Sequence, residues 1–162
     1  MNALLQRPHW AQKGKVQVYF APRGIVRKLK IALEKKDTPY VVGCLRFCTE
    51  TGVLNSMRKM RGVSLVVNDR TPRDYNLPRF RGTPVRVLKE GIMHQNFLVG
   101  LNTKKEPTWV AQFTMDLNNN HEHLENMMYI LDKNLATFFA EEYMRIYTHT
   151  LPLAEPVSIG EE

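Results

Sequence analysis

Two short apolar runs joined by a polar turn constrain the fold of this chain more than any other feature of its sequence. The runs cover residues 97–101 and 108–113, and both have the length and the β-branched or aromatic content of strands. The polar residues 102–107 between them allow the second run to fold back along the first. A third apolar run, residues 127–131, follows a polar stretch at 118–126. This order predicts a β-hairpin followed by a third strand.

The rest of the chain shows the patterns of helices and further strands. Apolar residues recur at helical spacing within 25–36, whereas residues 16–20 alternate between apolar and polar side chains. We expect helices at 25–36, 51–61 and 133–147, and strands at 16–20, 40–48, 63–67, 85–88, 97–101, 108–113 and 126–131. The resulting order, β-α-β-α-β-β-β-β-β-α, predicts an α/β (mixed α+β) domain with a mixed β-sheet flanked by helices on both faces.

A length of 162 residues suits one domain, which we place at residues 15–150. We expect a flexible N-terminal arm at 1–14 and a flexible C-terminal tail at 151–162. Residues 68–82 hold two prolines and four arginines and are expected to form a long loop, which in compact domains is often functional. The N-terminus lacks the apolar region of a signal peptide, and no run is long enough to cross a bilayer. We therefore expect an intracellular, cytoplasmic protein that does not enter a membrane.

Cys44 and Cys48 are the two cysteines of the chain. They lie four residues apart in the expected strand 40–48, where side chains at even spacing share one face. The chain has neither a CxxC spacing nor a second pair, which argues against a zinc or redox site. We predict two buried, reduced thiols, and we expect no metal and no cofactor.

Positive charge is concentrated in one part of the sequence. The net charge is +7, and residues 54–89 alone hold nine basic residues against Asp69 and Asp74, so the rest of the chain is balanced. A local excess of this kind favours a surface that faces a polyanion, nucleic acid first, over a solvated surface without a partner. The residues that we assign to a nucleic-acid interface are Arg58, Lys59, Arg70, Arg73, Arg79, Arg81, Arg86, Lys104 and Lys105.

The polar residues around the hairpin resemble those of a known family. His94 stands two residues before Asn96 at the entrance to the first hairpin strand, and Glu125-Asn126 opens the third strand. This order resembles the active-site half of the phospholipase D superfamily, and most closely its small, single-motif, Nuc-type endonucleases. In that family a His-x-Lys pair precedes the hairpin and a Glu-Asn pair follows it. Residues 16–24, 61–70 and 82–87 also resemble strands of this family, so the likeness covers residues 15–150.

The resemblance implies phosphodiesterase chemistry that needs no metal. In the family the histidine attacks phosphorus to form a phosphohistidine, and the lysine two residues later neutralises the charge that develops on the phosphate. Two chains pair as a homodimer, so that one histidine attacks while the other protonates the leaving oxygen. The resemblance therefore assigns His94 as the nucleophile, Glu125 as the residue that orients it, and position 96 as the phosphate contact.

Several positions depart from the family pattern. Asn96 replaces the lysine; it can donate hydrogen bonds to a phosphate but brings no charge. Leu101 stands where the extended pattern has an aspartate. Gln112 and Thr114 stand where it has serine and asparagine. These departures put the chemistry in doubt while leaving the expected fold intact.

Two further groups of side chains bear on the site. Lys104 or Lys105 would restore the missing charge only if the hairpin turn folded back toward the histidine, against the usual direction of a hairpin tip. His121 and His123 flank Glu122, but no third metal ligand at a fitting spacing is evident. We interpret these three residues as part of a polar loop.

Two functions from different classes follow. We favour a nucleic-acid-binding protein with a phospholipase D-like fold whose phosphodiesterase site is degenerate or attenuated, because three further departures accompany the loss of the lysine. The alternative is an active, metal-independent endonuclease in which His94 still attacks through a phosphohistidine. Lipid hydrolysis is disfavoured, because no amphipathic or lipid-binding apolar surface stands out.

Overall fold

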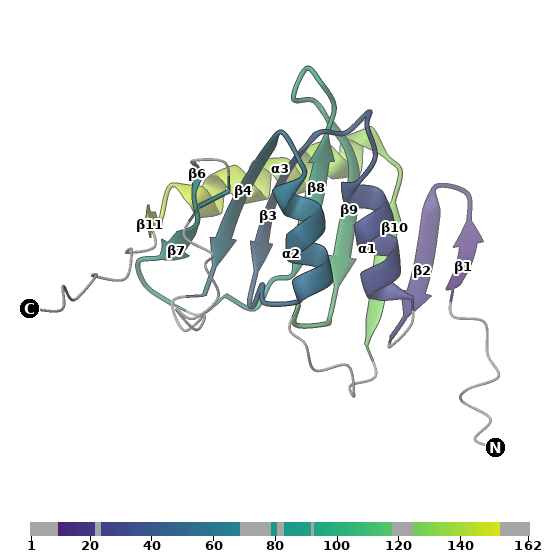
Figure 1. Ribbon diagram of the computed structural model, residues 1–162, viewed down its shortest axis with the longest axis horizontal. Coiled ribbons are helices and arrows are strands. Elements are labelled where there is room, and N and C mark those ends of the chain that lie inside the picture. The colour runs from purple at the N-terminus through teal and green to yellow at the C-terminus, as the bar shows by residue number, and fades with distance from the viewer. Residues whose placement is uncertain are drawn as a thin grey trace, which may run out of the picture.

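The computed structural model describes residues 10–21, 24–68, 79–80, 83–91, 93–117 and 125–152 of the chain. Within these residues, nine strands form one sheet in the order β1-β2-β10-β9-β8-β3-β4-β7-β11 (Figure 1). β4 lies parallel to both β3 and β7, and the other neighbours are antiparallel. The strands are β1 (Trp10–Lys13), β2 (Val16–Phe20), β3 (Tyr40–Leu45), β4 (Gly62–Val67), β7 (Arg86–Leu88), β8 (Phe97–Leu101), β9 (Pro107–Phe113), β10 (Asn126–Ile130) and β11 (Thr150–Pro152).

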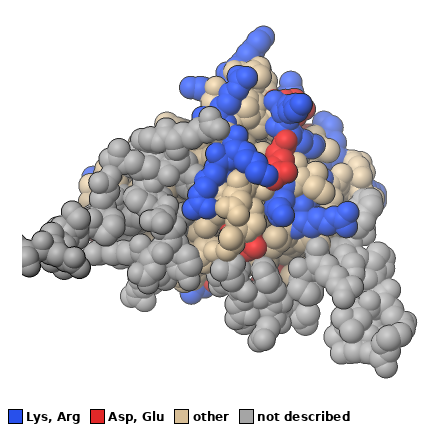
Figure 2. Space-filling view, viewed as in Figure 1, with Lys and Arg blue, Asp and Glu red and all other residues tan. Residues whose placement is uncertain are grey.

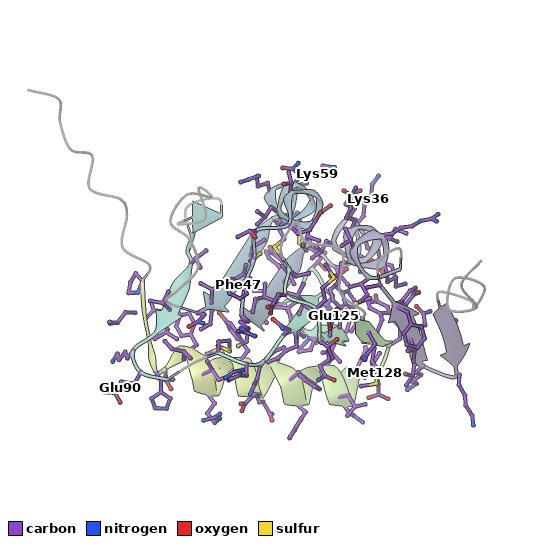
Figure 3. The ribbon with its side chains drawn as sticks, turned by 90° about the horizontal axis from the view of Figure 1, so that it is seen from below. Lys36, Phe47, Lys59, Glu90, Glu125 and Met128 are labelled. Carbon is purple, nitrogen blue, oxygen red and sulfur yellow. The ribbon has the colours of Figure 1, made fainter. Side chains whose placement is uncertain are left out.

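Helices cover both faces of this sheet. α1 (Ile25–Leu33) and α2 (Thr51–Arg58) lie on one face, and α3 (Lys133–Tyr147) lies on the other (Figures 1 and 3). Each face has its own core. Leu98 of β8 packs on the α1–α2 side, whereas its neighbours Phe97 and Val99 pack on the α3 side, because side chains alternate along a strand. The predicted class, a mixed sheet with helices on both faces, is confirmed.

The predicted elements differ from the structure mainly at their ends. The last helix has its predicted bounds, whereas α1 and α2 end earlier than expected, at Leu33 and Arg58. Residues 10–13 of the expected arm pair with β2, and residues 150–152 pair with β7. Within the expected loop, β5 (Arg79–Phe80) pairs with β6 (Thr83–Pro84) as a short hairpin. The remainders of the arm, loop and tail, residues 1–9, 69–78, 81–82 and 153–162, lie outside the described residues.

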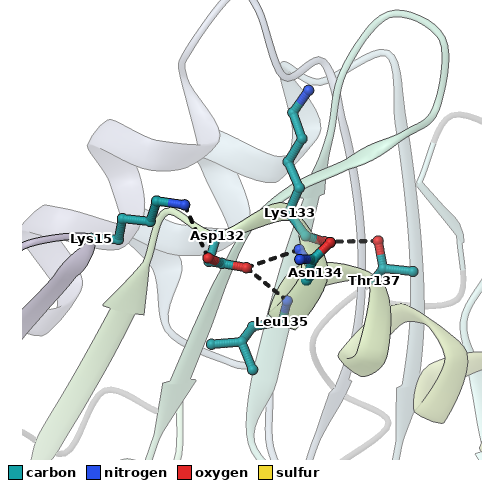
Figure 4. Close-up of polar contacts among 6 residues, drawn as sticks. All are labelled: Lys15, Asp132, Lys133, Asn134, Leu135 and Thr137. Carbon is teal, nitrogen blue, oxygen red and sulfur yellow. Dashed lines mark hydrogen bonds and ion pairs between the residues drawn. The ribbon is translucent and has the colours of Figure 1, made fainter.

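The start of α3 is set by its N-cap residue, Asp132. One carboxylate oxygen accepts hydrogen bonds from the backbone N–H groups of Asn134 at 2.9 Å and Leu135 at 3.1 Å (Figure 4). The other oxygen pairs with Lys15 Nζ at 3.1 Å, which connects the helix to the residue before β2. The Leu135 N–H group, followed by the Lys15 ammonium, lowers the pKa of the Asp132 carboxyl.

The β8–β9 hairpin depends on one close contact. Gly100 pairs with the buried Trp109 across the hairpin, and a Cβ atom at Gly100 would lie 2.0 Å from an atom of the indole ring. The indole Nε1 donates to Thr38 Oγ1 at 3.3 Å, and the ring packs against Tyr129 with centroids 5.3 Å apart. Only glycine fits against the ring, so this pair sets the register of the two strands.

The two cysteines are buried and free, but the prediction that they share a face was wrong. β3 ends at Leu45, so the alternation of a strand does not continue to Cys48. Cys44 packs in the core on the α3 side, and Cys48 packs in the core on the α1–α2 side. Burial raises the pKa of both thiols to about 12, so both are protonated near neutral pH.

Candidate active site

The side chains that the sequence assigns to the site gather at one end of the central strands. The ends of β3 and β9 flank the start of β8, because Cys44 and Gln112 both pair with Phe97. His94 lies just before β8 with an exposed side chain, and Glu125 lies just before β10, the neighbour of β9. Figure 3 views the molecule from this side, with Glu125 labelled. We call this the His94 edge; it comprises residues 46–47, 94–96, 114–116 and 125.

Asn96 forms an internal link at this edge. The residue is only 7% exposed, and its Oδ1 accepts a hydrogen bond from the backbone N–H of Arg46 at 2.9 Å. Its backbone carbonyl accepts the N–H of Phe113 at 3.0 Å. These two bonds connect the entrance of β8 to the ends of β3 and β9. A lysine at this position could not accept the Arg46 hydrogen bond, because an ammonium group has no acceptor.

A hollow of about 580 Å³ opens beside His94. One wall is aromatic: Phe139 of α3 packs edge-on against Phe97, with ring centroids 5.1 Å apart, and Phe138 lies next to it with 67% of its surface exposed. The hollow therefore places the His94 imidazole beside several side-chain amide groups and beside an apolar wall. Its full lining is His94, Gln95, Asn96, Phe97, Gln112, Phe113, Thr114, Phe138, Phe139 and Glu142.

The acidic residue of this hollow, Glu142, is already bound by two neighbours. Arg145 donates to it twice, at 2.7 Å for both bonds, and Gln95 donates to it at 3.2 Å. The Arg145 hydrogen bond lowers the pKa of the Glu142 carboxyl, so this group is charged at neutral pH. Because Arg145 compensates this charge, the carboxylate repels a bound anion less than a free one would.

Thr114 and Glu125 connect the ends of β9 and β10. The Thr114 hydroxyl donates to the Glu125 carboxylate and accepts the N–H of Asn126 at 3.1 Å. Among the described residues, no hydrogen bond joins Glu125 to His94. The role of Glu125 in orienting the histidine therefore stays a prediction from the resemblance.

Arg46 is a cation at this edge that sequence reasoning missed. Its Nη1 lies 3.8 Å from Asp116 Oδ2, and 44% of its side chain is exposed. The guanidinium carbon lies 5.5 Å from the centroid of the Phe47 ring. The signal in the sequence was weak, because Arg46 lies inside the expected strand 40–48 and outside the basic stretch 54–89.

The basic residues predicted to contact nucleic acid are distributed differently. The Arg86 guanidinium donates to the hydroxyl and the carbonyl of Thr150, at 2.6 and 2.9 Å, and lies 4.5 Å from the Tyr147 ring centroid. Arg86 therefore joins β7 to β11 and the end of α3. Arg58 and Lys59 end α2 and follow it, and both are exposed. Four predicted side chains lie outside the described part of the chain: Arg70, Arg73, Arg79 and Arg81.

The opposite ends of the strands carry a cluster of cations, which we call the basic edge. It consists of Lys35, Lys36, Lys59, Arg61, Lys104 and Lys105, near the acidic residues Glu34, Asp37 and Glu106. Lys105 lies 5.4 Å from the Tyr40 ring centroid, and Tyr40 pairs with Gly62, the residue after Arg61. A second hollow, of about 460 Å³, is lined on this side by Lys35, Lys36, Lys59 and Arg61, among others.

Figure 2 shows Lys and Arg side chains gathered over α1, α2 and the top of the molecule. In Figure 3, Lys36 and Lys59 lie at the α1–α2 layer, apart from Glu125. Lys36 precedes β3 and Lys59 precedes β4, so both lie at the ends of these strands opposite the His94 edge. Lys104 and Lys105 lie in the β8–β9 turn, at the far end of β8 from His94. Within one chain they therefore do not supply the charge that Asn96 lacks.

No metal site or membrane span is found in the described ranges. The described side chains include no group of three or more His, Cys, Asp or Glu that could hold a metal ion. His121, Glu122 and His123 lie outside those ranges. None of the described helices has both the length and the apolar character that crossing a membrane requires.

No protein-family model and no curated protein sequence matches this chain. Solved structures do match. Nuc, a phospholipase D family member from Salmonella typhimurium, aligns with a TM-score of 0.67 at 16% identity, over 85% of this chain and 96% of its own. NucT from Helicobacter pylori aligns with a TM-score of 0.65 at 13% identity, over 85% and 98%. TrmBL2, an archaeal chromatin protein that binds DNA, aligns with a TM-score of 0.55 at 13% identity, over 92% and 57%.

The chain therefore has the fold of the phospholipase D superfamily. Its architecture is Nuc-like, since the match to Nuc and NucT spans nearly their whole length. The resemblance inferred from the sequence is confirmed at the level of the fold.

Proposed function

We propose that this chain is a nucleic-acid-binding protein with a Nuc-like fold and a degenerate or attenuated phosphodiesterase site. The main support for this proposal is that Asn96 is buried and bonded within the protein. The family pattern needs a cation two residues after the histidine, and here a buried amide serves as an acceptor within the scaffold. Loss of a charge-assisted contact to an anionic transition state commonly costs orders of magnitude in rate.

His94 keeps a binding role in this proposal. It is exposed at the rim of a hollow whose other polar groups include the side-chain amides of Asn96 and Gln112. Such groups donate hydrogen bonds to a phosphate oxygen without activating it strongly. A phosphate of the bound nucleic acid would thus be held at the His94 edge and not cleaved, or cleaved slowly.

The basic edge supports a polyanionic ligand. Its six cations exceed the three acidic neighbours, and apart from half-buried Lys35 they are exposed. Lys59 pairs with Glu34 at 3.0 Å, whereas Lys36, Arg61, Lys104 and Lys105 can contact successive phosphates and release counterions. TrmBL2, one of the proteins of similar fold, is a DNA-binding chromatin protein. The likeness covers the fold alone. Experiment decides whether the ligand is DNA or RNA and whether it is single- or double-stranded.

We further propose that the chain acts as a homodimer. Leu135 and Phe138 lie in the first two turns of α3, Leu131 directly precedes its N-cap residue, and each of the three is at least 40% exposed. Met128 of β10 adds to this apolar surface. Because Phe138 also lines the His94 hollow, a second copy covering this surface would bring two histidines together. Light scattering should give a dimer at micromolar concentration, and Leu135→Asp should give a monomer; a monomeric wild-type protein excludes the pairing.

The alternative function is a metal-independent endonuclease that uses His94 through a phosphohistidine. The observation in its favour is that His94 is exposed and that Thr114 and Glu125 hold the neighbouring strand ends in place. Another cation would then have to neutralise the transition state.

One experiment separates the two functions. Labelled single- and double-stranded DNA and RNA are incubated with the protein in EDTA and scored for both mobility shift and cleavage. We expect salt-sensitive binding with cleavage absent or very slow. The variants His94→Ala and Asn96→Lys are run alongside, and Asn96→Lys should give at most a partial gain of cleavage.

Robust cleavage by the wild-type protein that His94→Ala abolishes would replace the binding function with the nuclease. A failure to bind any of the four nucleic acids at low salt would reject both functions.

A further inference from the structure

Arg46 lies next to the position where the family pattern places its lysine. Its backbone N–H donates to Asn96 Oδ1 at 2.9 Å, so the two residues are in direct contact between the end of β3 and the start of β8. Arg46 directly follows the last residue of β3, and Asn96 directly precedes the first residue of β8 and lies two residues after His94. The buried amide thus holds the backbone of an arginine at the entrance of the strand that His94 precedes.

Among the described residues, the side chain of Arg46 has only weak polar contacts. The distance of 3.8 Å to Asp116 is at the long end for an ion pair, and both side chains are in contact with solvent. Exposed pairs of this kind contribute little to stability. The guanidinium carbon also lies 5.5 Å from the centroid of the Phe47 ring, a contact that adds a modest cation–π attraction.

We propose that Arg46 binds a phosphate group at the His94 edge and replaces the charge that Asn96 does not provide, with Asp116 as the internal anion that the phosphate displaces. This inference rests on the proposed function. Arginine suits the role because its planar, permanently charged fork presents paired N–H donors to two phosphate oxygens. A cation placed in this way favours binding of a phosphate whether or not cleavage follows.

The proposal is tested with ligands that report on this edge alone. Inorganic phosphate and a 5′-phosphorylated dinucleotide are titrated into the ¹⁵N-labelled full chain, and the Arg46 Nε–H and His94 ring signals are followed by NMR. Both signals should shift with one shared dissociation constant. Arg46→Ala should weaken binding about fivefold or more, the loss expected for one exposed charge-assisted contact, and Arg46→Lys should fall between Arg46→Ala and wild type.

Asp116 gives the sharper test. Asp116→Asn should strengthen phosphate binding about two- to threefold, because it removes the competing anion. The same change made together with Arg46→Ala should bring no gain, which shows that the two residues act through each other. Lys13→Ala and Glu90→Gln change the charge by the same amounts at exposed positions outside the His94 edge, and both should leave the dissociation constant within error.

An Arg46 signal that does not move, or an Arg46→Ala variant that binds phosphate as tightly as wild type, overturns the proposal. So does an equal gain from Asp116→Asn with and without Arg46. The proposed function fails separately, if a long oligonucleotide shows no salt-sensitive binding while Arg46 still responds to phosphate. Circular dichroism of each variant confirms that the fold is retained.

Discussion

The His94 edge and the basic edge lie at opposite ends of the same strands, and they differ in what their polar side chains do. At the His94 edge several of these side chains bind within the protein: Asn96 accepts from the backbone N–H of Arg46, and Thr114 donates to Glu125. At the basic edge six cations stand near three acidic residues, and much of the positive charge faces solvent. Site geometry and attraction for polyanions are therefore carried by different residues and can be perturbed separately.

The largest effect is expected from reversing charge at the basic edge. Lys36→Glu combined with Arg61→Glu should lower affinity for a long oligonucleotide by on the order of tenfold to a hundredfold at moderate salt, because phosphate contacts are lost and repulsion is added. Fluorescence anisotropy over a series of salt concentrations measures both the affinity and the salt slope. Arg27→Glu with Lys89→Glu makes the same change of charge at exposed positions toward the other end of the strands, so it is the matched control and should have a much smaller effect. Unchanged affinity in the first variant would show that the basic edge is only a solvated surface.

The second effect concerns stability at the His94 edge. Asn96→Ala should lower the free energy of unfolding by about 1–2 kcal/mol, because the Arg46 N–H loses its partner in a partly buried position. Urea denaturation measures this loss, with the exposed Gln95→Ala as the control. Asn96→Lys should cost at least as much, since it also brings an ammonium group to a buried site. If Asn96→Lys were as stable as wild type and cleaved nucleic acid well, the structural role of Asn96 would be refuted.

The third effect concerns Asp132, the N-cap residue of α3, which also pairs with the exposed Lys15. The pKa of Asp132 is lowered in the folded chain, so its contribution to stability is present above its ordinary value of 3.8 and is lost as the pH falls through the folded value. Asp132→Asn should therefore lower the melting temperature at pH 7, and the difference from wild type should disappear in acid. A constant difference down to pH 2 would contradict this.

The smallest effect is expected from the hairpin turn. Lys104→Ala with Lys105→Ala should change phosphate binding at the His94 edge by less than about twofold, because exposed charges more than a Debye length apart interact weakly. The dinucleotide titration described above measures it. A clear loss would mean that the turn reaches a His94 edge after all, for instance that of a second chain.

The sequence predicted the parts of this fold that depend on local pattern. The hairpin, the helix over 133–147 and the position of His94 before β8 follow from apolar periodicity and from the residues around the turn. The ends of the helices were predicted less accurately. Basic residues follow α1 and α2, and such residues are equally compatible with a helix or a loop.

The side-chain roles at the site could not be predicted in the same way. Whether Asn96 faces a ligand or the backbone of Arg46 depends on how β3 and β8 meet, and these strands are about fifty residues apart in the sequence. Cys44 and Cys48 were assigned to one face because the end of β3 at Leu45 is not visible in the apolar pattern. The basic edge combines residues from the segments that follow α1 and α2 with residues of the hairpin turn, so a count along the sequence captured only part of it.

The contact of Gly100 with Trp109 has a consequence for how this chain can vary. The ladder shifts its register between Gly100 and Leu101, on the turn side of that contact, whereas the pairing from Gly100 to Phe97 is regular. A change in turn length would therefore be absorbed at the shift and would not move Gln112 relative to Phe97. Residues 102–106 should accept insertions or a reporter sequence without disturbing the spacing at His94. The hairpin thus offers a place to attach a label at one end of the molecule while the other end keeps its geometry.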